Sequence, residues 1–135
     1  MNNSMINKLR LGSSRTLQGI RCVLADADIA KGEIIEEAPV VIIPKSDMKY
    51  IDQTVLTHYE FMWNKENGEE AIVVGYGSIY NHSFDPNIEF KQNYEKKTMV
   101  FTALRDIKKG EELCSNYQQG DDPAKIPKEY VNYKY

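Results

Sequence analysis

The chain consists of short β-branched and aromatic runs that glycine, proline or asparagine interrupts about every ten residues. Val40–Ile43 is one such run, and it ends at Pro44 because proline has no N–H to continue a strand ladder. Asn67-Gly68 is a typical hairpin turn between the apolar segments Tyr59–Trp63 and Ala71–Val74. Short strands with frequent turns predict a mostly β domain with little helix.

Residues 33–56 are predicted to form two strands followed by a short helical patch. Pro39 divides the apolar region into the strands Glu33–Ala38 and Val40–Ile43, since it cannot donate to a ladder. From Ser46, a candidate N-cap, to about Leu56, apolar residues recur at near-helical spacing. We therefore expect the helix to be confined to this patch.

The remaining strands are expected to form hairpins around polar turns. Ile88–Phe90 and Met99–Ala103 are predicted partners on either side of a polar stretch at residues 93–97. The turns Ile29–Glu33 and Ile107–Glu111 resemble each other, with a glycine next to last in both. This similarity is too short to indicate a repeat architecture.

Size and composition indicate a single globular domain. The 135 residues are 41% hydrophobic and 27% charged, which excludes a disordered or fibrous chain. The net charge of −3 and the isoelectric point of 5.4 argue against holding nucleic acid by phosphate neutralisation. They suit a basic partner, and they also suit an ordinary acidic surface. No apolar run reaches the roughly 20 residues of a membrane helix, and residues 1–8 lack a signal-peptide core, so we expect a cytoplasmic protein.

The cysteines and histidines are too few for a disulfide-rich or zinc-binding domain. Cys22 and Cys114 are the only cysteines, and neither lies in a C-x-x-C pair. A structural zinc site would require both of them together with His58 and His82, the only histidines. We therefore predict a metal-free chain whose cysteines are buried apolar residues rather than reactive thiols.

Two segments have the composition of a functional site. Gly75–Asn87 combines glycines, small polar residues and aromatics between two predicted strands, which is typical of a backbone that approaches a ligand. Gly110–Tyr117 ends a predicted strand on a tyrosine. Taken alone, the first segment is also explained by turn chemistry and the second by a buried tyrosine at a strand end.

Taken together and in this order, these segments resemble the SET domain, the family of protein-lysine methyltransferases that use S-adenosylmethionine. The resemblance runs from about Leu9 to Tyr117, and the size is similar to that of minimal viral and bacterial members. It includes the turn Ile29–Glu33, the strand end Glu36–Pro39, the block Tyr59–Trp63, the signature Asn-His-Ser-x-x-Pro-Asn at residues 81–87 and the ending Glu-Glu-Leu-x-x-x-Tyr at residues 111–117.

The resemblance implies a fold as well as a family. It predicts a SET-domain (β-clip) fold of short strands with a C-terminal pseudoknot, an exception to the usual unthreaded topology. It places an N-terminal tail at residues 1–8, the SET domain at residues 9–117 and a post-SET-like tail at residues 118–135.

The resemblance also implies roles for single residues. Tyr117 resembles the catalytic tyrosine whose hydroxyl lies beside the transferring methyl group. Asn81 is expected near the methionyl end of the cofactor, and the backbone of His82 at its adenine. The full predicted set is Gly19, Ile20, Arg21, Cys22, Tyr59, Asn81 and His82 for the cofactor and Phe61, Tyr80, Phe90 and Ser115 for the substrate. Neither Phe90 nor Ser115 is a tyrosine, which in this family predicts that di- or trimethylation is allowed.

The chemistry of such a reaction explains why no dedicated base is predicted. Methyl transfer from a sulfonium to an amine is an in-line displacement that depends mainly on alignment. A narrow apolar channel beside a positive sulfonium lowers the pKa of a lysine, so the amine reaches the site neutral. The expected partner is a basic protein or peptide that presents a lysine, and the family resemblance also allows a homodimer.

One departure from the family pattern leaves a second function open. The family usually carries Gly-x-Gly before the strand that corresponds to Val23–Ala25, whereas this chain has Ile20-Arg21-Cys22. The Cys22 side chain either narrows the cofactor pocket or points outward. The alternatives are a SET-fold protein-binding module with weak or no activity and an unrelated small β domain that assembles partners. A set of acidic residues either forms a solvated face or steers a basic peptide: Glu66, Glu69, Glu70, Asp121 and Asp122.

Overall fold

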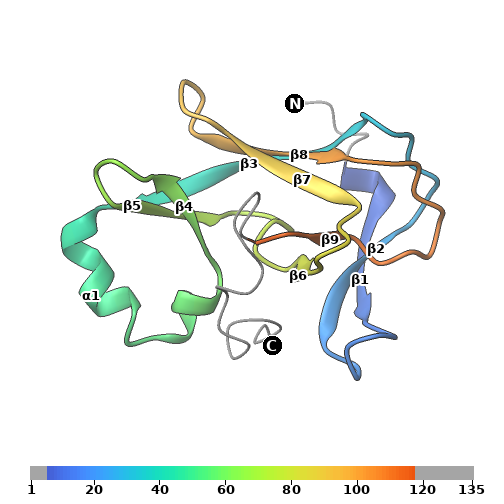
Figure 1. The fold of residues 1–135 in the computed structure, drawn as a ribbon, viewed down its shortest axis with the longest axis horizontal. Coiled ribbons are helices and arrows are strands. Elements are labelled where there is room, and N and C mark those ends of the chain that lie inside the picture. Colours follow the sequence, from blue (N-terminus) through green and yellow to red (C-terminus); the bar gives the residue numbers. More distant parts are fainter. Residues whose placement is uncertain (1–5, 118–135) are drawn as a thin grey trace.

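The computed structural model describes residues 6–117 as nine strands and four short helical segments (Figure 1). The strands are β1 (Leu9–Ser13), β2 (Arg21–Ala25), β3 (Ile34–Ile43), β4 (Glu60–Asn64), β5 (Glu69–Val73), β6 (Asn81–His82), β7 (Ile88–Asn93), β8 (Thr98–Ala103) and β9 (Cys114–Ser115). The helical segments are η1 (Ile6–Lys8), η2 (Lys45–Asp47), α1 (Met48–Ile51) and η3 (Val55–His58). The predicted mostly β architecture is confirmed. Predicted tail residues 118–135 lie outside the described residues.

The strands form two sheets. β1 and β2 pair as an antiparallel hairpin, and the other strands form a sheet in the order β4-β5-β3-β8-β7-β9-β6. Figure 1 shows the β1–β2 hairpin at one end of the molecule and α1 with β4 and β5 at the other. The predicted hairpins β4–β5 and β7–β8 are both present. Gly68 in the β4–β5 turn has a φ of 75°, a conformation that favours glycine.

The predicted break at Pro39 is wrong, because β3 continues through it. Up to Pro39 the strand pairs with β8, and from Val40 it pairs with β5 on its other edge. Proline lacks an N–H, but its carbonyl still accepts a bond from the Val74 N–H at 2.9 Å. β3 therefore changes its partner from β8 to β5 at the residue that has no N–H to donate.

The predicted helical patch is divided into the three short segments η2, α1 and η3. α1 spans only Met48–Ile51, and its N-cap is Asp47 rather than the predicted Ser46. Thr54 interrupts the helical pattern, because its hydroxyl donates to the Ile51 carbonyl at 2.8 Å and accepts from the Leu56 N–H at 3.2 Å. Within residues 6–117, no helix is long and apolar enough to span a membrane.

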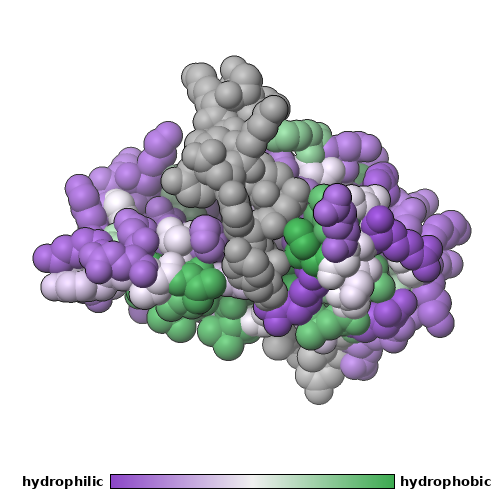
Figure 2. All heavy atoms as spheres, turned by 90° about the horizontal axis from the view of Figure 1, so that it is seen from below, coloured by the Kyte–Doolittle hydropathy of each residue, from purple (hydrophilic) through white to green (hydrophobic). Residues whose placement is uncertain are grey.

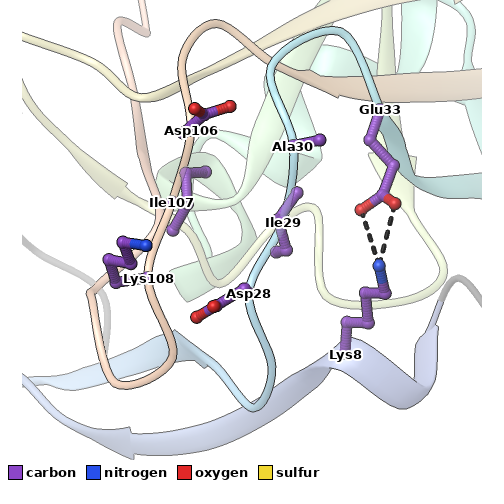
Figure 3. A pocket seen from close by; sticks show the side chains of 8 residues that line it. All are labelled: Lys8, Asp28, Ile29, Ala30, Glu33, Asp106, Ile107 and Lys108. Carbon is purple, nitrogen blue, oxygen red and sulfur yellow. Dashed lines mark hydrogen bonds and ion pairs between the residues drawn. The ribbon is translucent and has the colours of Figure 1, made fainter.

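The two similar turns pair with each other (Figure 3). Ile29 and Ile107 form an antiparallel bridge, and both side chains are buried. Each turn also receives a carboxylate from the other, since the Lys31 N–H donates to Asp106 at 2.8 Å and the Lys109 N–H donates to Asp28 at 2.9 Å. The local resemblance therefore reflects a two-fold packing arrangement.

A cavity of about 320 Å³ lies between these turns, and four of its charged side chains form ion pairs or hydrogen bonds within the fold. Lys8 forms an ion pair with Glu33 at 2.8 Å across the cavity, as Figure 3 shows. Asp28 and Asp106 accept the backbone bonds described above. We therefore assign this cavity to the packing of the turns rather than to ligand binding.

The core lies between the sheet and the hairpin, and its fully buried residues include Ile35, Tyr80, Met99 and Phe101. On the face seen in Figure 2, strongly hydrophilic side chains occupy both ends of the molecule, and apolar groups lie between them. Five strands of the large sheet, β3, β4, β5, β7 and β8, thus share one core with the β1–β2 hairpin.

β9 lies between β6 and β7, although β6 and β7 are neighbours in the sequence. The connection from β6 to β7 bonds to β9 on both sides: the Ser83 N–H donates to the Ser115 carbonyl at 2.9 Å, and the Asn87 N–H donates to the Cys114 carbonyl at 3.1 Å. This insertion agrees with the predicted C-terminal pseudoknot, and it places the last described residues next to the Asn-His-Ser segment.

Candidate functional site

Tyr117, the last described residue, packs against His82, the residue next to Asn81 on β6. Its backbone N–H donates to Nδ1 of His82 at 3.1 Å, and the two ring centroids lie 5.1 Å apart. Its hydroxyl donates to the backbone carbonyl of Tyr80 at 2.7 Å. Parallel pairing of β6 with β9, with His82 opposite Ser115, positions these groups. The structure thus brings the predicted catalytic tyrosine to the predicted cofactor residues.

The Tyr117 phenol is held in its neutral form. Burial raises its pKa far above the usual value, and the nearby Cys114, Glu112 and Tyr59 raise it further. A phenol with so high a pKa keeps its proton at neutral pH. The hydroxyl therefore acts as a hydrogen-bond donor to Tyr80 and not as a base.

The side-chain amide of Asn81 has a fixed orientation. Its Nδ2 donates to the Arg21 carbonyl at 3.1 Å and to Oε2 of Glu112 at 3.0 Å. Its Oδ1 is buried and has no hydrogen-bond partner within residues 6–117. A buried acceptor without a donor is costly, so this oxygen marks a place where a ligand donor would be bound.

Glu112 connects several parts of the site, although the sequence analysis gave it no role. Its carboxylate accepts from the Asn81 amide and from the Ser14 hydroxyl. Its backbone carbonyl accepts from Nδ2 of Asn87 at 2.8 Å. The Glu-Glu-Leu motif was the available signal, but only the fold shows which carboxylate faces Asn81.

The loop between β1 and β2 is closed by its own backbone next to Asn81. The Ser14 N–H donates to the Ile20 carbonyl at 2.8 Å, and the Gly19 N–H donates to the Ser14 carbonyl at 3.1 Å. Gly19 has a φ of 81°, which a side chain would strain. Of the predicted cofactor residues in this loop, Arg21 contacts Asn81 directly, and Gly19 and Ile20 form the turn that leads to it.

Cys22 points into the interior, so the outward orientation considered above is wrong. Its side chain is fully buried, and burial together with the charge of Glu112 raises its thiol pKa to about 11. Cys114 is half-buried and donates to Oε2 of Glu112 at 3.3 Å, and burial raises its pKa as well. Both thiols are protonated at neutral pH, as expected of unreactive cysteines. A narrowing of the cofactor pocket by Cys22 stays a prediction.

The aromatic residues predicted for the substrate pack on one another. Phe61 on β4 meets Phe90 on β7 edge to face, with centroids 4.9 Å apart. Tyr80 is completely buried, and its ring lies 4.9 Å from Phe101, which the sequence analysis did not select. Phe101 also lies 6.1 Å from Phe61. These rings form one cluster next to the backbone that holds Tyr117.

The remaining predicted site residues are Ser115, predicted for the substrate, and Tyr59, predicted for the cofactor. Ser115 is buried, and its Oγ has no hydrogen-bond partner in the described part of the chain. The Tyr59 carbonyl accepts from the Ser78 hydroxyl at 2.9 Å, which connects the residue before β4 to the segment before β6. Tyr59 also contributes to the raised pKa of Tyr117, which places the two phenols in one electrostatic environment.

Glu60, between Tyr59 and Phe61, is an acidic group in an unfavourable environment. Burial, together with the negative charges of Glu70 and Asp52, raises its pKa from 4.5 to about 7. Its Oε2 is buried without a hydrogen-bond partner among the described residues. The folded state therefore binds this proton more tightly than the unfolded state does.

We expect the Glu60→Gln variant to be more stable than the parent chain above neutral pH. The folded-state pKa lies above the unfolded one, so the contribution of Glu60 is fully present below pH 4.5 and is lost as the pH rises to about 7. With solvent screening of this half-buried group, the gain at about pH 8 is about 1 kcal/mol. Thermal unfolding of both proteins at about pH 5 and 8 measures it. Glu66→Gln, an exposed neighbour, is the control, and equal pH slopes for parent and Glu60→Gln would contradict the assignment.

Comparison with known proteins decides the family. A family model described as the SET domain matches residues 20–118 of this chain. The chain belongs to the SET-domain family. In the described part of this SET domain, no three His, Cys, Asp or Glu side chains gather as metal ligands.

One curated relative of this SET domain is an enzyme. The chain is 34% identical over 98 residues to a Schizosaccharomyces pombe histone-lysine N-methyltransferase specific for lysine 37 of histone H3. The match covers 72% of this chain and 65% of that protein, so the SET domain spans less than two thirds of its relative.

Solved structures with the same fold are also similar in sequence. A crystal structure of a Plasmodium falciparum protein is 28% identical, has a TM-score of 0.68 and covers 87% of this chain and 97% of its own. Polycomb repressive complex 2 of Chaetomium thermophilum, in an autoinhibited conformation bound to S-adenosylmethionine, is 27% identical, with a TM-score of 0.67. That match covers 81% of the SET domain chain and 15% of the larger chain.

Proposed function

We propose that the chain is a protein-lysine N-methyltransferase that transfers a methyl group from S-adenosylmethionine to the ε-amine of a lysine. The observation that carries this proposal is the neutral Tyr117 hydroxyl, held 2.7 Å from the Tyr80 carbonyl beside Asn81 and His82. Membership of the SET-domain family and the histone-lysine methyltransferase among its relatives support it.

The residues around Asn81 suit a cofactor that carries an ammonium group. S-adenosylmethionine has one at its methionyl end, and Oδ1 of Asn81 is a buried acceptor that lacks a donor within the described chain. β6 is the last strand of the sheet formed by residues 6–117. The backbone of His82 on this strand would bind the adenine, with Arg21, Gly19 and Tyr59 completing the site.

The chain's own residues would act mainly by alignment. S-adenosylmethionine supplies a sulfonium-bound methyl group that an amine can displace. The Tyr117 hydroxyl and the Tyr80 carbonyl place two oxygen atoms side by side. Such oxygens orient a polarised methyl group by C–H···O contacts of about 0.5–1 kcal/mol each. In-line geometry then accounts for most of the rate enhancement.

The attacking lysine must lose its proton before transfer. Tyr117 does not take this proton, because its phenol keeps its own. The aromatic pair Phe61 and Phe90 would instead line an apolar channel, where desolvation lowers the pKa of a lysine. The amine would thus deprotonate to solvent on entry, and no carboxylate or histidine base is needed.

The substrate we propose is a basic segment of a protein, such as a histone. The S. pombe relative acts on histone H3 according to its name, and this chain carries a net charge of −3. Glu60, Glu70 and Asp52 form an acidic group close to Phe61, which favours an approaching cation. The homodimer and the cytoplasmic location stay predictions.

Calorimetry and mass spectrometry with the full chain test this function. Calorimetry should show that S-adenosylmethionine binds to the chain. Purified core histones that are incubated with the chain and S-adenosylmethionine should gain methyl groups on lysine, as measured by mass spectrometry. Binding without transfer to histones or to any basic protein in a lysate would favour the alternative, a SET-fold binding module. Absence of cofactor binding would overturn the enzyme assignment.

A further inference from the structure

Glu36 is a buried carboxyl group that the proposed reaction does not use. It lies on β3 opposite Phe101 of β8, and only 2% of its surface is exposed. Burial raises its pKa above the usual value. A carboxyl group is rarely retained in such a place without specific partners.

Both oxygens of Glu36 accept hydrogen bonds from the segment that leads to β6. The Tyr80 hydroxyl donates to Oε1 at 2.8 Å, and the Tyr76 backbone N–H donates to Oε2 at 2.7 Å. Burial also raises the pKa of the Tyr80 phenol well above its usual value, so this hydroxyl remains the donor. One carboxyl group thus holds both ends of residues 76–80.

The backbone of residues 75–77 lies in close contact with the side chains of Glu36 and Phe101. A Cβ on Gly75 would clash with Oε2 of Glu36, and one on Gly77 would lie 2.6 Å from the Phe101 ring. Neither position has room for a side chain, which explains the glycines on both sides of Tyr76. The segment therefore cannot shift toward the core, and Glu36 prevents it from lifting away.

The same segment supplies the acceptor for the Tyr117 hydroxyl. Within Tyr80, the ring is buried against Phe101 with its hydroxyl on Glu36, while the carbonyl accepts from Tyr117 at 2.7 Å. The position of this carbonyl depends on where the Tyr80 ring is anchored. Glu36 and Tyr117 are thus connected through one residue.

We propose that Glu36 and the Tyr80 hydroxyl form a buried positioning pair that fixes the Tyr80 carbonyl and, through it, the Tyr117 phenol. This inference rests on the proposed methyl transfer and deepens it. Glu36 is a positioning residue, because it acts through Tyr80 and lies in the core rather than at the reacting atoms.

Kinetics of three variants test the pair. Tyr80→Phe keeps the ring and removes its hydroxyl, and we expect kcat to fall about tenfold with KM and cofactor affinity unchanged, as for one lost hydrogen bond. Glu36→Leu should match that loss, whereas Glu36→Gln keeps two hydrogen-bonding atoms and should stay within about threefold of the parent. Tyr94→Phe in the β7–β8 turn and Glu37→Gln next to Glu36 are matched controls. Equal kcat for Tyr80→Phe and the parent would overturn the pair.

A readout without turnover separates this inference from the proposed function. In the full chain labelled with ¹³Cζ-tyrosine, the Tyr117 resonance is assigned by its loss in Tyr117→Phe. We expect it to shift in Tyr80→Phe and to stay in place in Tyr94→Phe. An unmoved resonance would refute the positioning pair even in an active enzyme. A shift in a chain that transfers no methyl group would refute the proposed function alone. If Glu36→Leu does not fold, Tyr80→Phe decides the question.

Discussion

Replacing Tyr117 by phenylalanine is expected to slow methyl transfer about 100-fold or more while cofactor affinity changes little, because misplacement of one aligning group costs that much in a reaction governed by geometry. The variant keeps the ring that packs on His82 and removes the hydroxyl that donates to Tyr80. Single-turnover rates with S-adenosylmethionine and a basic substrate measure the first effect, and calorimetry measures the second.

Tyr94→Phe is the matched control for this variant. Tyr94 is exposed, and its ring contacts Trp63 rather than any residue of the site. It should leave the transfer rate at the parent value. Should Tyr117→Phe transfer methyl groups as fast as Tyr94→Phe, the catalytic role of the Tyr117 hydroxyl is refuted.

Replacing Asn81 by alanine is expected to weaken S-adenosylmethionine binding between about 10-fold and 100-fold, the range for a hydrogen bond to a charged group. The substitution removes the buried Oδ1 that has no donor in the described chain. It also removes the amide that donates to Glu112 and to the Arg21 carbonyl, so a lower unfolding temperature is expected as well.

The thermal effect needs its own control. Asn87→Ala removes another buried amide near Glu112. Both atoms of this amide already have partners, since Nδ2 donates to the Glu112 carbonyl and Oδ1 accepts from the Cys114 N–H, so neither is left for a ligand. Asn87→Ala should lower the unfolding temperature, but it should weaken S-adenosylmethionine binding less than Asn81→Ala does. Equal affinities in both variants, after correction for the folded fraction, would show that Asn81 holds the fold and not the cofactor.

Much of the fold could be predicted from local pattern. Short apolar and aromatic runs between polar turns indicated β4, β5, β7 and β8, and Asn67-Gly68 indicated the turn between β4 and β5. The predicted break at Pro39 was wrong because it assumed that a strand keeps the same hydrogen-bonded neighbour along its length. β3 instead changes its neighbour at this residue. The length of α1 depended on Thr54, whose hydroxyl competes for backbone groups.

The site could be predicted only as a set of residues and not as an arrangement. The family resemblance selected Tyr117, Asn81 and His82, and the fold brings them together. It gave no role to Glu36 or Glu112, because each contacts residues far away in the sequence. No local periodicity records such pairs, so only coordinates reveal them.

The position of β9 between β6 and β7 has a consequence for biosynthesis. A ribosome releases β6 and β7 well before the segment that separates them in the finished sheet. Until residue 115 has emerged, the two earlier strands must stay apart, or pair wrongly and reopen. The site that we propose for S-adenosylmethionine is therefore assembled only after residue 117 has emerged, when β9 can enter between the two earlier strands.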